Sequence, residues 1–474
     1  MVFSSTVFIF CFLPVTIIGY FLINNLTYKN TWLLIMSLVF FGWSQPGYLW
    51  IIFLSILINY LGAYAAFVAE ARSKVAKRAV LFAAIAANLS LLYYFKYFDF
   101  TIQTINSIGH TEIPLKNIIL PIGISFFTFQ GMSYVIDVYR GEVPVQKNPF
   151  KVALYIVLFP QLIAGPIVRY TDIANEIGSR KTTISDLSSG ITRFVIGLGK
   201  KAIIANTMAE VADGIWNGDI AGNTVLIAWL GSIAYSLQIF YDFSGYSDMA
   251  IGLGRVFGFH FIENFNRPYI SRSISEFWRR WHISLSTWFR DYVYIPLGGN
   301  RKHLYRNLWT IFFLTGLWHG ASWHFVIWGL WNGLFMVIER RFRKRLMSED
   351  VSVPKRILQH IYALFIINIG WVLFRADTLY MALKYIGTMF GVGLSKTPGF
   401  TIFWHLNWWV VFVLVIAVID ITGGFIRLKD GVFRKISTPA LYKTAKAVAI
   451  YGILILSVMR IMSGTYNPFI YFQF

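Results

Sequence analysis

Long apolar runs separated by short polar segments extend along almost the whole chain. The first, Val2 to Ile23, has no basic segment before it of the kind a signal peptide carries, so we interpret it as a retained span. The other runs are Thr31 to Trp43, Gly47 to Ala69, Ala79 to Phe95, Ile118 to Val138, Val152 to Val168, Ile191 to Ala205, Val225 to Phe243, Leu308 to Ile338, Ile361 to Phe374, Met381 to Val392, Trp408 to Ile421 and Ala447 to Ile461. Several fall short of the roughly 20 residues that a spanning helix needs, which predicts re-entrant and interfacial segments among the spans.

This pattern predicts an all-α polytopic integral membrane protein with roughly eleven to thirteen membrane helices, in a single domain over residues 1–474. The composition agrees, since 57% of the residues are hydrophobic and 14% are charged, against about 25% charged residues in a soluble domain. The net charge of +20 does not indicate a nucleic-acid partner, because the basic residues are dispersed over loops between apolar runs. The single cysteine, Cys11, excludes an intrachain disulfide and a cysteine zinc site.

Basic clusters between the runs set the expected orientation, because Lys and Arg near span ends stay on the cytoplasmic side. The clusters are Arg72, Lys74, Lys77 and Arg78; Arg340, Arg341, Arg343, Lys344, Arg345, Lys355 and Arg356; and Arg427, Lys429, Arg434, Lys435, Lys443 and Lys446. If all are cytoplasmic, the last span leaves residues 463–474 on the external face. We therefore predict an external C-terminal aromatic tail.

The segment from Trp278 to Tyr294 alternates bulky aromatic side chains with arginines. We expect it to lie at the cytoplasmic interface, with tryptophans at the depth of the lipid headgroups. Its arginines could bind lipid headgroups or the phosphates of a nucleotide-bearing donor, and the residues by themselves favour neither.

His319 stands inside the apolar run Leu308 to Ile338, where an ionisable group indicates function by default. From His319 to Glu339 is 20 residues, or about 30 Å if helical, so His319 is predicted to lie deep in the membrane, unless Gly316 and Gly320 break or tilt the helix. A near-neutral imidazole can take a proton from an alcohol, as acyl transfer to a hydroxyl requires. A structural histidine that bonds a neighbouring helix is the alternative.

Other polar groups in apolar segments carry weaker predictions. His319 and His324 are five residues apart, about 140° around a helix, and no carboxylate lies near them in sequence, so no metal site is predicted. Asp137 and Asp242 interrupt apolar runs, and we expect each to be paired or to line an aqueous path. The aromatic hexapeptide of residues 469–474 is apolar enough to fold back into a cavity.

Four ordered blocks resemble the membrane-bound O-acyltransferase family, in its bacterial alginate O-acetyltransferase branch. They are PIGISFFTFQGMSYVIDVYRG (Pro121 to Gly141), FPQLIAGPIVRY (Phe159 to Tyr170), FWRRWHISLSTWFRDYVYIPLGGNR (Phe277 to Arg301) and GLWHGASWHFVIWGLWNG (Gly316 to Gly333). The resemblance covers most of the chain. It implies a multi-pass protein of the bacterial cytoplasmic membrane, built around a transmembrane tunnel.

The resemblance also implies the site residues. The signature histidines of the family fall on His319, as catalytic base, and on His282, as an essential partner nearer the cytoplasmic mouth. The implied donor is acetyl-CoA from the cytosol, and we name Arg279, Arg280, Arg290 and Trp281 as its candidate binding residues.

The C-terminal hexapeptide resembles a motif in envelope-acylation systems whose tyrosine is proposed to carry the acyl group. Carried over, Tyr471 would receive acetyl, with His319 as base, and pass it to an extracytoplasmic partner enzyme that acetylates a polysaccharide. Anchoring of the tail is the alternative role.

Two competing functions remain at this point. Within the family, the chain could transfer another acyl group, such as D-alanine onto teichoic acids from a carrier protein. From a different class, it could be a transporter or flippase whose Asp and His groups relay protons, although matching halves are absent from the sequence.

Overall fold

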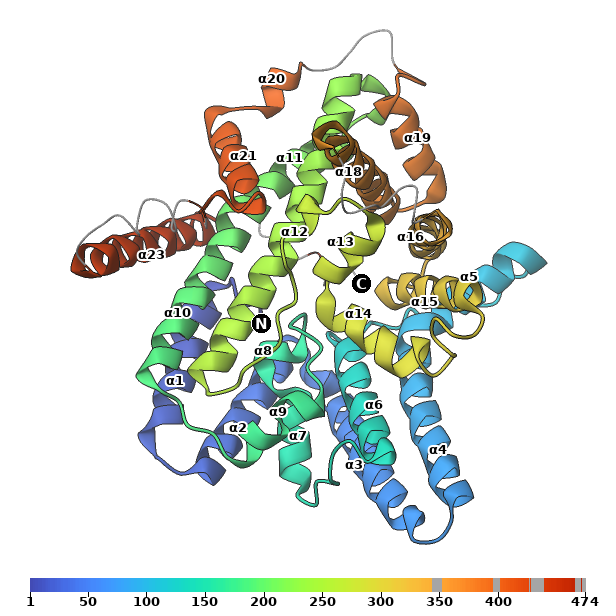
Figure 1. Cartoon of the computed structure of the whole chain (residues 1–474), viewed down its shortest axis with the longest axis vertical. Helices are drawn as coiled ribbons and strands as arrows, with labels where there is room; N and C mark the ends of the chain where they lie inside the picture. Colours follow the sequence, from blue (N-terminus) through green and yellow to red (C-terminus); the bar gives the residue numbers. More distant parts are fainter. Residues whose placement is uncertain (343–351, 395–400, 426, 428–438, 465–469, 471–474) are drawn as a thin grey trace. The chain divides into compact units, whose positions relative to one another are not determined.

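A computed structural model describes residues 1–342, 352–394, 401–425, 427, 439–464 and 470. Every regular element in these residues is a helix, which confirms the all-α prediction (Figure 1). Tyr471 and the basic residues at 343–345, 429, 434 and 435 lie outside the described residues. The chain folds into two compact units, one of Met1–Phe194 with Ser247–Ile262 and one of Val195–Tyr246 with Glu263–Phe474. The prediction of a single functional domain stays a prediction.

The first unit holds the N-terminal helices. These are η1 (Phe8–Phe12), α1 (Leu13–Leu22), α2 (Leu26–Ser44), η2 (Pro46–Tyr48), α3 (Leu49–Glu70), α4 (Lys74–Leu92), η3 (Tyr93–Tyr97), α5 (Phe98–Gly109), α6 (Ile124–Arg140), α7 (Pro149–Val157), α8 (Phe159–Leu162), α9 (Tyr170–Gly178) and most of α10 (Ile184–Gly199). Asp137 is fully buried on α6.

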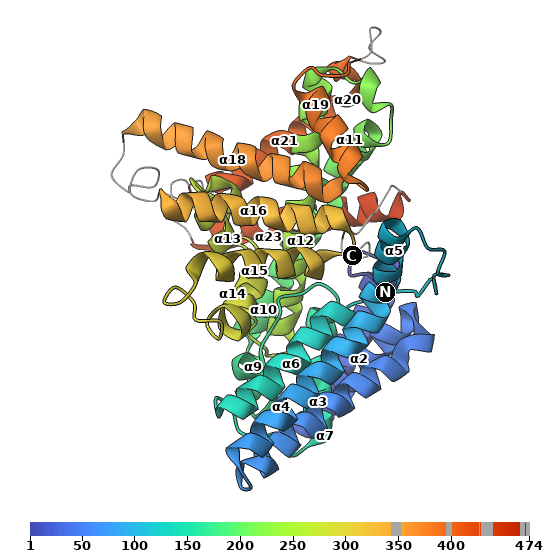
Figure 2. The ribbon, with the colours of Figure 1, turned by 90° about the vertical axis from the view of Figure 1, so that its right-hand side faces the viewer.

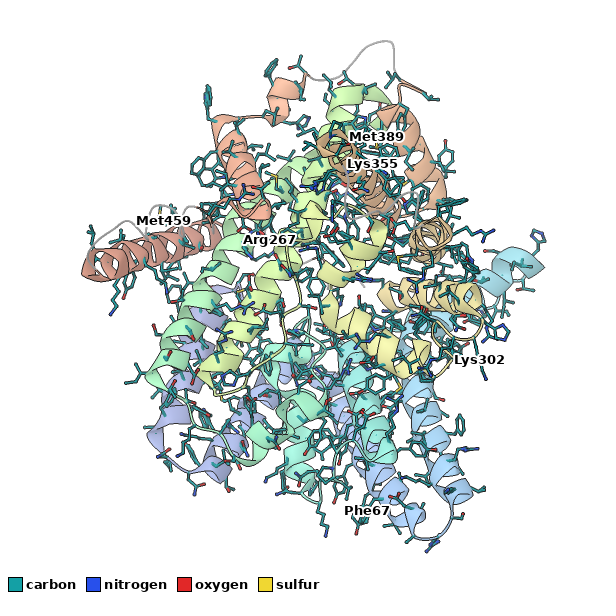
Figure 3. The ribbon with its side chains drawn as sticks, in the orientation of Figure 1. Phe67, Arg267, Lys302, Lys355, Met389 and Met459 are labelled. Atoms are coloured by element: carbon teal, nitrogen blue, oxygen red, sulfur yellow. The ribbon has the colours of Figure 1, made fainter. Side chains whose placement is uncertain are left out.

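Helix α3 shows the inside-out distribution of a membrane helix. Its exposed face carries large apolar side chains, including Phe53, Leu57 and Phe67, and Phe67 points outward in Figure 3. Its buried face carries Asn59, whose amide exchanges hydrogen bonds of 3.1 and 3.0 Å with Asn88 of α4. Because lipid offers no hydrogen-bonding partners, polar side chains satisfy one another across the helix contact.

The second unit holds the remaining helices. These are η4 (Lys200–Ala205), α11 (Asn206–Trp216), η5 (Ile220–Gly222), most of α12 (Val225–Val256), η6 (Pro268–Ile270), α13 (Ile274–Arg280), α14 (Ile283–Phe289), η7 (Arg290–Tyr294), α15 (Leu304–His319), α16 (Trp323–Arg341), α18 (Val353–Arg375), α19 (Leu379–Met389), α20 (Ile402–His405), α21 (Trp408–Ile421) and α23 (Pro439–Met462).

Five segments of the described residues are long and apolar enough to cross a membrane: Pro46–Glu70, Lys74–Gly109, Val225–Val256, Val353–Arg375 and Lys443–Met462. Two shorter apolar helices, Phe8–Leu22 and Trp408–Ile421, add to them. These helices make the chain a multi-pass membrane protein. The count of eleven to thirteen membrane helices and the tunnel stay predictions.

The apolar run Leu308 to Ile338 forms two helices rather than one. Helix α15 ends at His319, the backbone is extended at Gly320, and α16 begins at Trp323. The two helices pack closely because Gly316 and Gly329 face each other, where a Cβ on Gly329 would meet the backbone of Phe312 and Gly316. Figure 2 shows α15, α16 and α18 stacked in that order. His319 thus lies at the turn of a helical hairpin.

Candidate active site

The segment around His282 is held by a buried asparagine from the preceding loop. His282 separates α13 from α14, two helices of seven residues each, and its φ of 43° places it in the left-handed region. The backbone carbonyl of Asn264 accepts the N–H of Ile283 at 2.9 Å. The Asn264 side-chain oxygen accepts the backbone N–H of Ser284 at 3.2 Å and its hydroxyl at 2.9 Å. Asn264 thereby stabilises a conformation that a non-glycine residue rarely adopts.

The same asparagine determines the tautomer of His282. Its oxygen lies 3.1 Å from Nδ1 of His282. The backbone N–H of Ser284 can only donate, so the Asn264 atom that it contacts is the side-chain oxygen, an acceptor. The hydrogen bond between this oxygen and Nδ1 therefore places the ring proton on Nδ1 and leaves the lone pair on Nε2. Nε2 is buried and has no hydrogen-bond partner among the described residues. Burial lowers the pKa of His282 to about 3, so the ring is neutral at physiological pH.

Aromatic side chains connect His282 to His319. The ring of Trp318 lies 5.8 Å from the His282 ring and 4.9 Å from the His319 ring, measured between centroids. Phe243 of α12 packs edge-to-face on His282 at 4.6 Å. Trp328 and Phe374 pack on His319 at 4.9 and 5.3 Å. Both histidines are buried, at 0% and 3% exposure, so the structure brings the two predicted residues into one aromatic cluster.

His324 lies at the edge of this cluster, where its ring packs on Phe325 at 4.1 Å and Phe325 packs on Phe374 at 4.9 Å. It belongs to α16 rather than to the helix of His319, so the angular argument from a common helix does not apply. Its Nδ1 lies 2.8 Å from the hydroxyl of Ser322. No group of three His, Cys, Asp or Glu side chains that could hold a metal occurs within the part of the chain that the structure describes.

Three of the four residues named for donor binding line cavities. Arg279 and Arg290 line a cavity of about 510 Å³, together with Arg340 and, from α15, Thr315. Arg290 is paired with Asp291 at 2.6 Å. Thr315 lies one helical turn before His319, so the arginine-lined cavity extends along α15 toward the histidines.

The other two named residues lie elsewhere. Arg280 pairs with Glu276 at 2.9 Å and lines a second cavity of about 1260 Å³, which includes Arg267 and Trp229. Figure 3 labels Arg267. Trp281 is 1% exposed, stacks on Phe277 and contacts Trp371, and lines neither cavity.

Sequence reasoning missed two partner residues, Asn264 and Lys201. Asn264 lies in an irregular segment with no motif around it, and only the fold shows its contact with His282. Asp242 was expected to be paired or to line an aqueous path, and it is paired with Lys201 at 2.6 Å. That lysine lies in an apolar run and gave no signal as a partner.

The sequence matches the membrane-bound O-acyltransferase (MBOAT) family over residues 3–382. The chain belongs to this family. It is 40% identical over 503 aligned residues to the probable alginate O-acetylase AlgI of Pseudomonas putida, with both chains covered completely. It is 38% identical to the peptidoglycan O-acetyltransferase of Helicobacter pylori, over 83% of this chain and 80% of that protein. It is 31% identical to the teichoic acid D-alanyltransferase of Bacillus subtilis, over 58% of this chain and 71% of that protein.

Membership in the MBOAT family confirms the predicted resemblance and makes the protein an O-acyltransferase. The family supports the O-acyltransferase hypothesis over that of a transporter or flippase. The residue roles inside the MBOAT site, including that of Tyr471, stay predictions, since Tyr471 lies outside the described residues.

Proposed function

We propose that this MBOAT protein moves acetyl groups from cytosolic acetyl-CoA across the cytoplasmic membrane for O-acetylation of a cell-envelope or secreted polysaccharide. The observation that carries the proposal is the aromatic cluster in which Trp318 contacts both His282 and His319. The alginate and peptidoglycan O-acetyltransferases among the relatives support acetyl as the transferred group and a polysaccharide as the final acceptor.

The two histidines take different roles in this proposal. His319 acts as general base and removes the proton of the attacking hydroxyl, whose oxygen forms a bond to the acetyl carbonyl carbon. The carbon–sulfur bond of the thioester breaks, and the thiolate of coenzyme A takes up the proton. His282 presents Nε2 as a fixed acceptor, because Asn264 holds the proton on Nδ1. A neutral acceptor can orient a hydroxyl group without adding charge to a buried site.

The donor reaches the histidines through the cavity that Arg279 and Arg290 line. Guanidinium groups at its rim suit the phosphates of coenzyme A. The inner lining at Phe312 and Thr315 suits a slender, less polar arm that ends in the thioester. In this proposal Arg280, already paired with Glu276, helps to form the basic cytoplasmic face, and Trp281 supports the His282 segment by packing.

Orientation follows from the charge distribution. We place the basic loops in the cytosol and the C-terminal tail outside, so the donor enters at one face and acetyl leaves at the other. This direction makes chemical sense, because coenzyme A is too polar to cross the bilayer, whereas the acetyl group alone is small. An extracytoplasmic partner enzyme then completes the transfer to the polysaccharide.

Tyr471 serves as the acyl relay in the proposal. Its phenolic oxygen attacks the thioester, His319 takes the phenolic proton, and the product is an aryl ester. Phenolate leaves more readily than an alkoxide, so the ester remains reactive toward the partner enzyme. Support comes from Ile470, the preceding residue, whose side chain is buried at 4% exposure and whose N–H bonds Asp242.

The test is the intact mass of the purified full chain after incubation with acetyl-CoA. We expect an adduct of about 42 Da on the C-terminal peptide, absent in His319→Ala and in Tyr471→Phe. His324→Ala is the matched control, because it alters a histidine at the edge of the aromatic cluster that has no role in the proposed transfer, and it should retain the adduct. Polysaccharide acetylation that persists in cells with Tyr471→Phe would eliminate the relay, and persistence with His319→Ala would eliminate the base.

The similarity to the D-alanyltransferase supports one alternative, transfer of D-alanine from a carrier protein. The same mass measurement separates the two, since a D-alanyl adduct is heavier, at about 71 Da. An adduct that forms with a D-alanyl carrier and not with acetyl-CoA would establish this alternative.

A further inference from the structure

A fully buried ion pair connects two helical segments of the second unit. Nζ of Lys201 in η4 lies 2.6 Å from a carboxylate oxygen of Asp242 in α12, and each side chain is 2% exposed. The free energy needed to remove two charges from water often exceeds the attraction between them. Apolar residues of similar size often stabilise a protein as well as a buried ion pair does. A fully buried Lys201–Asp242 pair therefore indicates a role beyond holding two helices together.

The backbone is shaped to bring this pair together. Gly245 of α12 packs against η4, where a Cβ would lie 2.8 Å from the carbonyl oxygen of Gly197 and 3.1 Å from the backbone nitrogen of Lys201. A side chain at Gly245 would force the segments apart. Because Asp242 lies one turn before Gly245, this close approach brings its carboxylate to Lys201.

The pair also binds the backbone of Ile470. The backbone N–H of Ile470 donates to the second carboxylate oxygen of Asp242 at 2.9 Å. The Ile470 side chain is 4% exposed. Nζ of Lys201 lies against one oxygen of the carboxylate, and the Ile470 N–H binds the other. The carboxylate thus holds the backbone of Ile470 in place.

The position of Asp242 relates this contact to the active site. The next residue along α12 is Phe243, whose ring packs on His282 at 4.6 Å. Ile470 is therefore held beside the part of α12 that forms the wall of the histidine cluster. Tyr471, the proposed relay, directly follows the residue that is held.

We propose that the Lys201–Asp242 pair is a docking site for the chain's own C-terminal segment, with Asp242 as a positioning residue that holds Tyr471 for acyl transfer. The positioning role rests on the proposed function, whereas the docking does not. The site recognises a backbone N–H that is followed by an apolar side chain. The carboxylate of Asp242 accepts the hydrogen bond from the N–H, and Lys201 balances the charge of the carboxylate.

Hydrogen exchange of the detergent-solubilised full chain tests the docking without any acetyl transfer. We expect the Ile470 amide to exchange slowly in the wild type and faster by about tenfold or more in Lys201→Met/Asp242→Leu. The double substitution removes both charges together, so it avoids leaving one of them buried and unpaired. Ile470→Val should retain acetyl transfer in cells, and Ile470→Pro, which lacks the N–H and leaves the ion pair intact, should lose about tenfold or more of it.

The outcomes distinguish the docking from the relay. The docking would be overturned if the Ile470 amide of Lys201→Met/Asp242→Leu exchanged as slowly as in the wild type, while the variant kept its helix content and unfolding temperature. Transfer by Ile470→Pro at the rate of Ile470→Val would overturn the positioning role. In Tyr471→Phe, hydrogen exchange of the Ile470 amide should stay slow. If the docking is correct and the relay is wrong, this variant will also retain polysaccharide acetylation in cells.

Discussion

His282 obtains its chemical character from its neighbours rather than from its own residue type. The left-handed backbone turns the ring toward Asn264, and the Asn264 oxygen holds the proton on Nδ1. Phe243 and Trp318 exclude water from the ring. A histidine in this environment is a neutral, directed acceptor instead of a group that titrates near pH 6.5.

This environment predicts how stability depends on pH. Because the pKa of His282 is about 3 in the native state and about 6.5 in the unfolded chain, the unfolded state alone binds a proton between these values. The His282 contribution is therefore complete above about pH 6.5 and is lost as the pH falls toward 3, by at most about 1.4 kcal/mol per pH unit.

Unfolding temperatures of the wild type and of His282→Asn at pH 7, 6 and 5 measure this contribution. The difference between the two proteins isolates His282 from other titrating groups, and we expect the wild type to lose stability more steeply. Parallel pH profiles would contradict a neutral, buried His282.

At the scale of the helices, the α15–α16 hairpin determines where His319 lies. Its turn could not be located from hydrophobicity, because the turn residues Gly320 to Ser322 and most of both helices lie within one apolar run. The structure locates the turn and shows that the two helices approach closely at Gly316 and Gly329.

Gly329→Ala should therefore destabilise the hairpin. The added methyl group would meet the backbone of Phe312 and Gly316, so α15 and α16 must separate, at a cost of about 1–3 kcal/mol. Gly452→Ala in α23 is the matched control, because a Cβ there meets nothing within 4 Å, and it should be neutral or slightly stabilising. Thermal unfolding in detergent compares the two, and equal unfolding temperatures would show that the packing tolerates a side chain.

Across the whole molecule, the sequence was most informative where the structure depends on a local pattern of residues, such as an apolar run or a motif block. Apolar runs and four motif blocks predicted the all-α membrane fold, the family and the two histidines that the structure places together. The contacts of Asn264 with His282 and of Lys201 with Asp242 were not predictable, since each joins segments far apart in the chain with no pattern between them. The sequence singled out Ile470 only as part of an apolar hexapeptide, and its hydrogen bond to Asp242 became visible only in the fold.

The remaining whole-molecule question is which face of the membrane each end of the chain occupies, and the basic loops predict the answer. Arg72, exposed between α3 and α4, should be cytoplasmic, whereas Ser463, exposed after α23, should be external. Single cysteines at these positions, Arg72→Cys and Ser463→Cys in a Cys11→Ser chain, report the sides through labelling with a membrane-impermeant maleimide. We expect Ser463→Cys to react in intact cells and Arg72→Cys to react only after the inner membrane is permeabilised. The reverse pattern, or reaction of both in intact cells, would contradict the orientation and with it the proposed path of acetyl from cytosol to exterior.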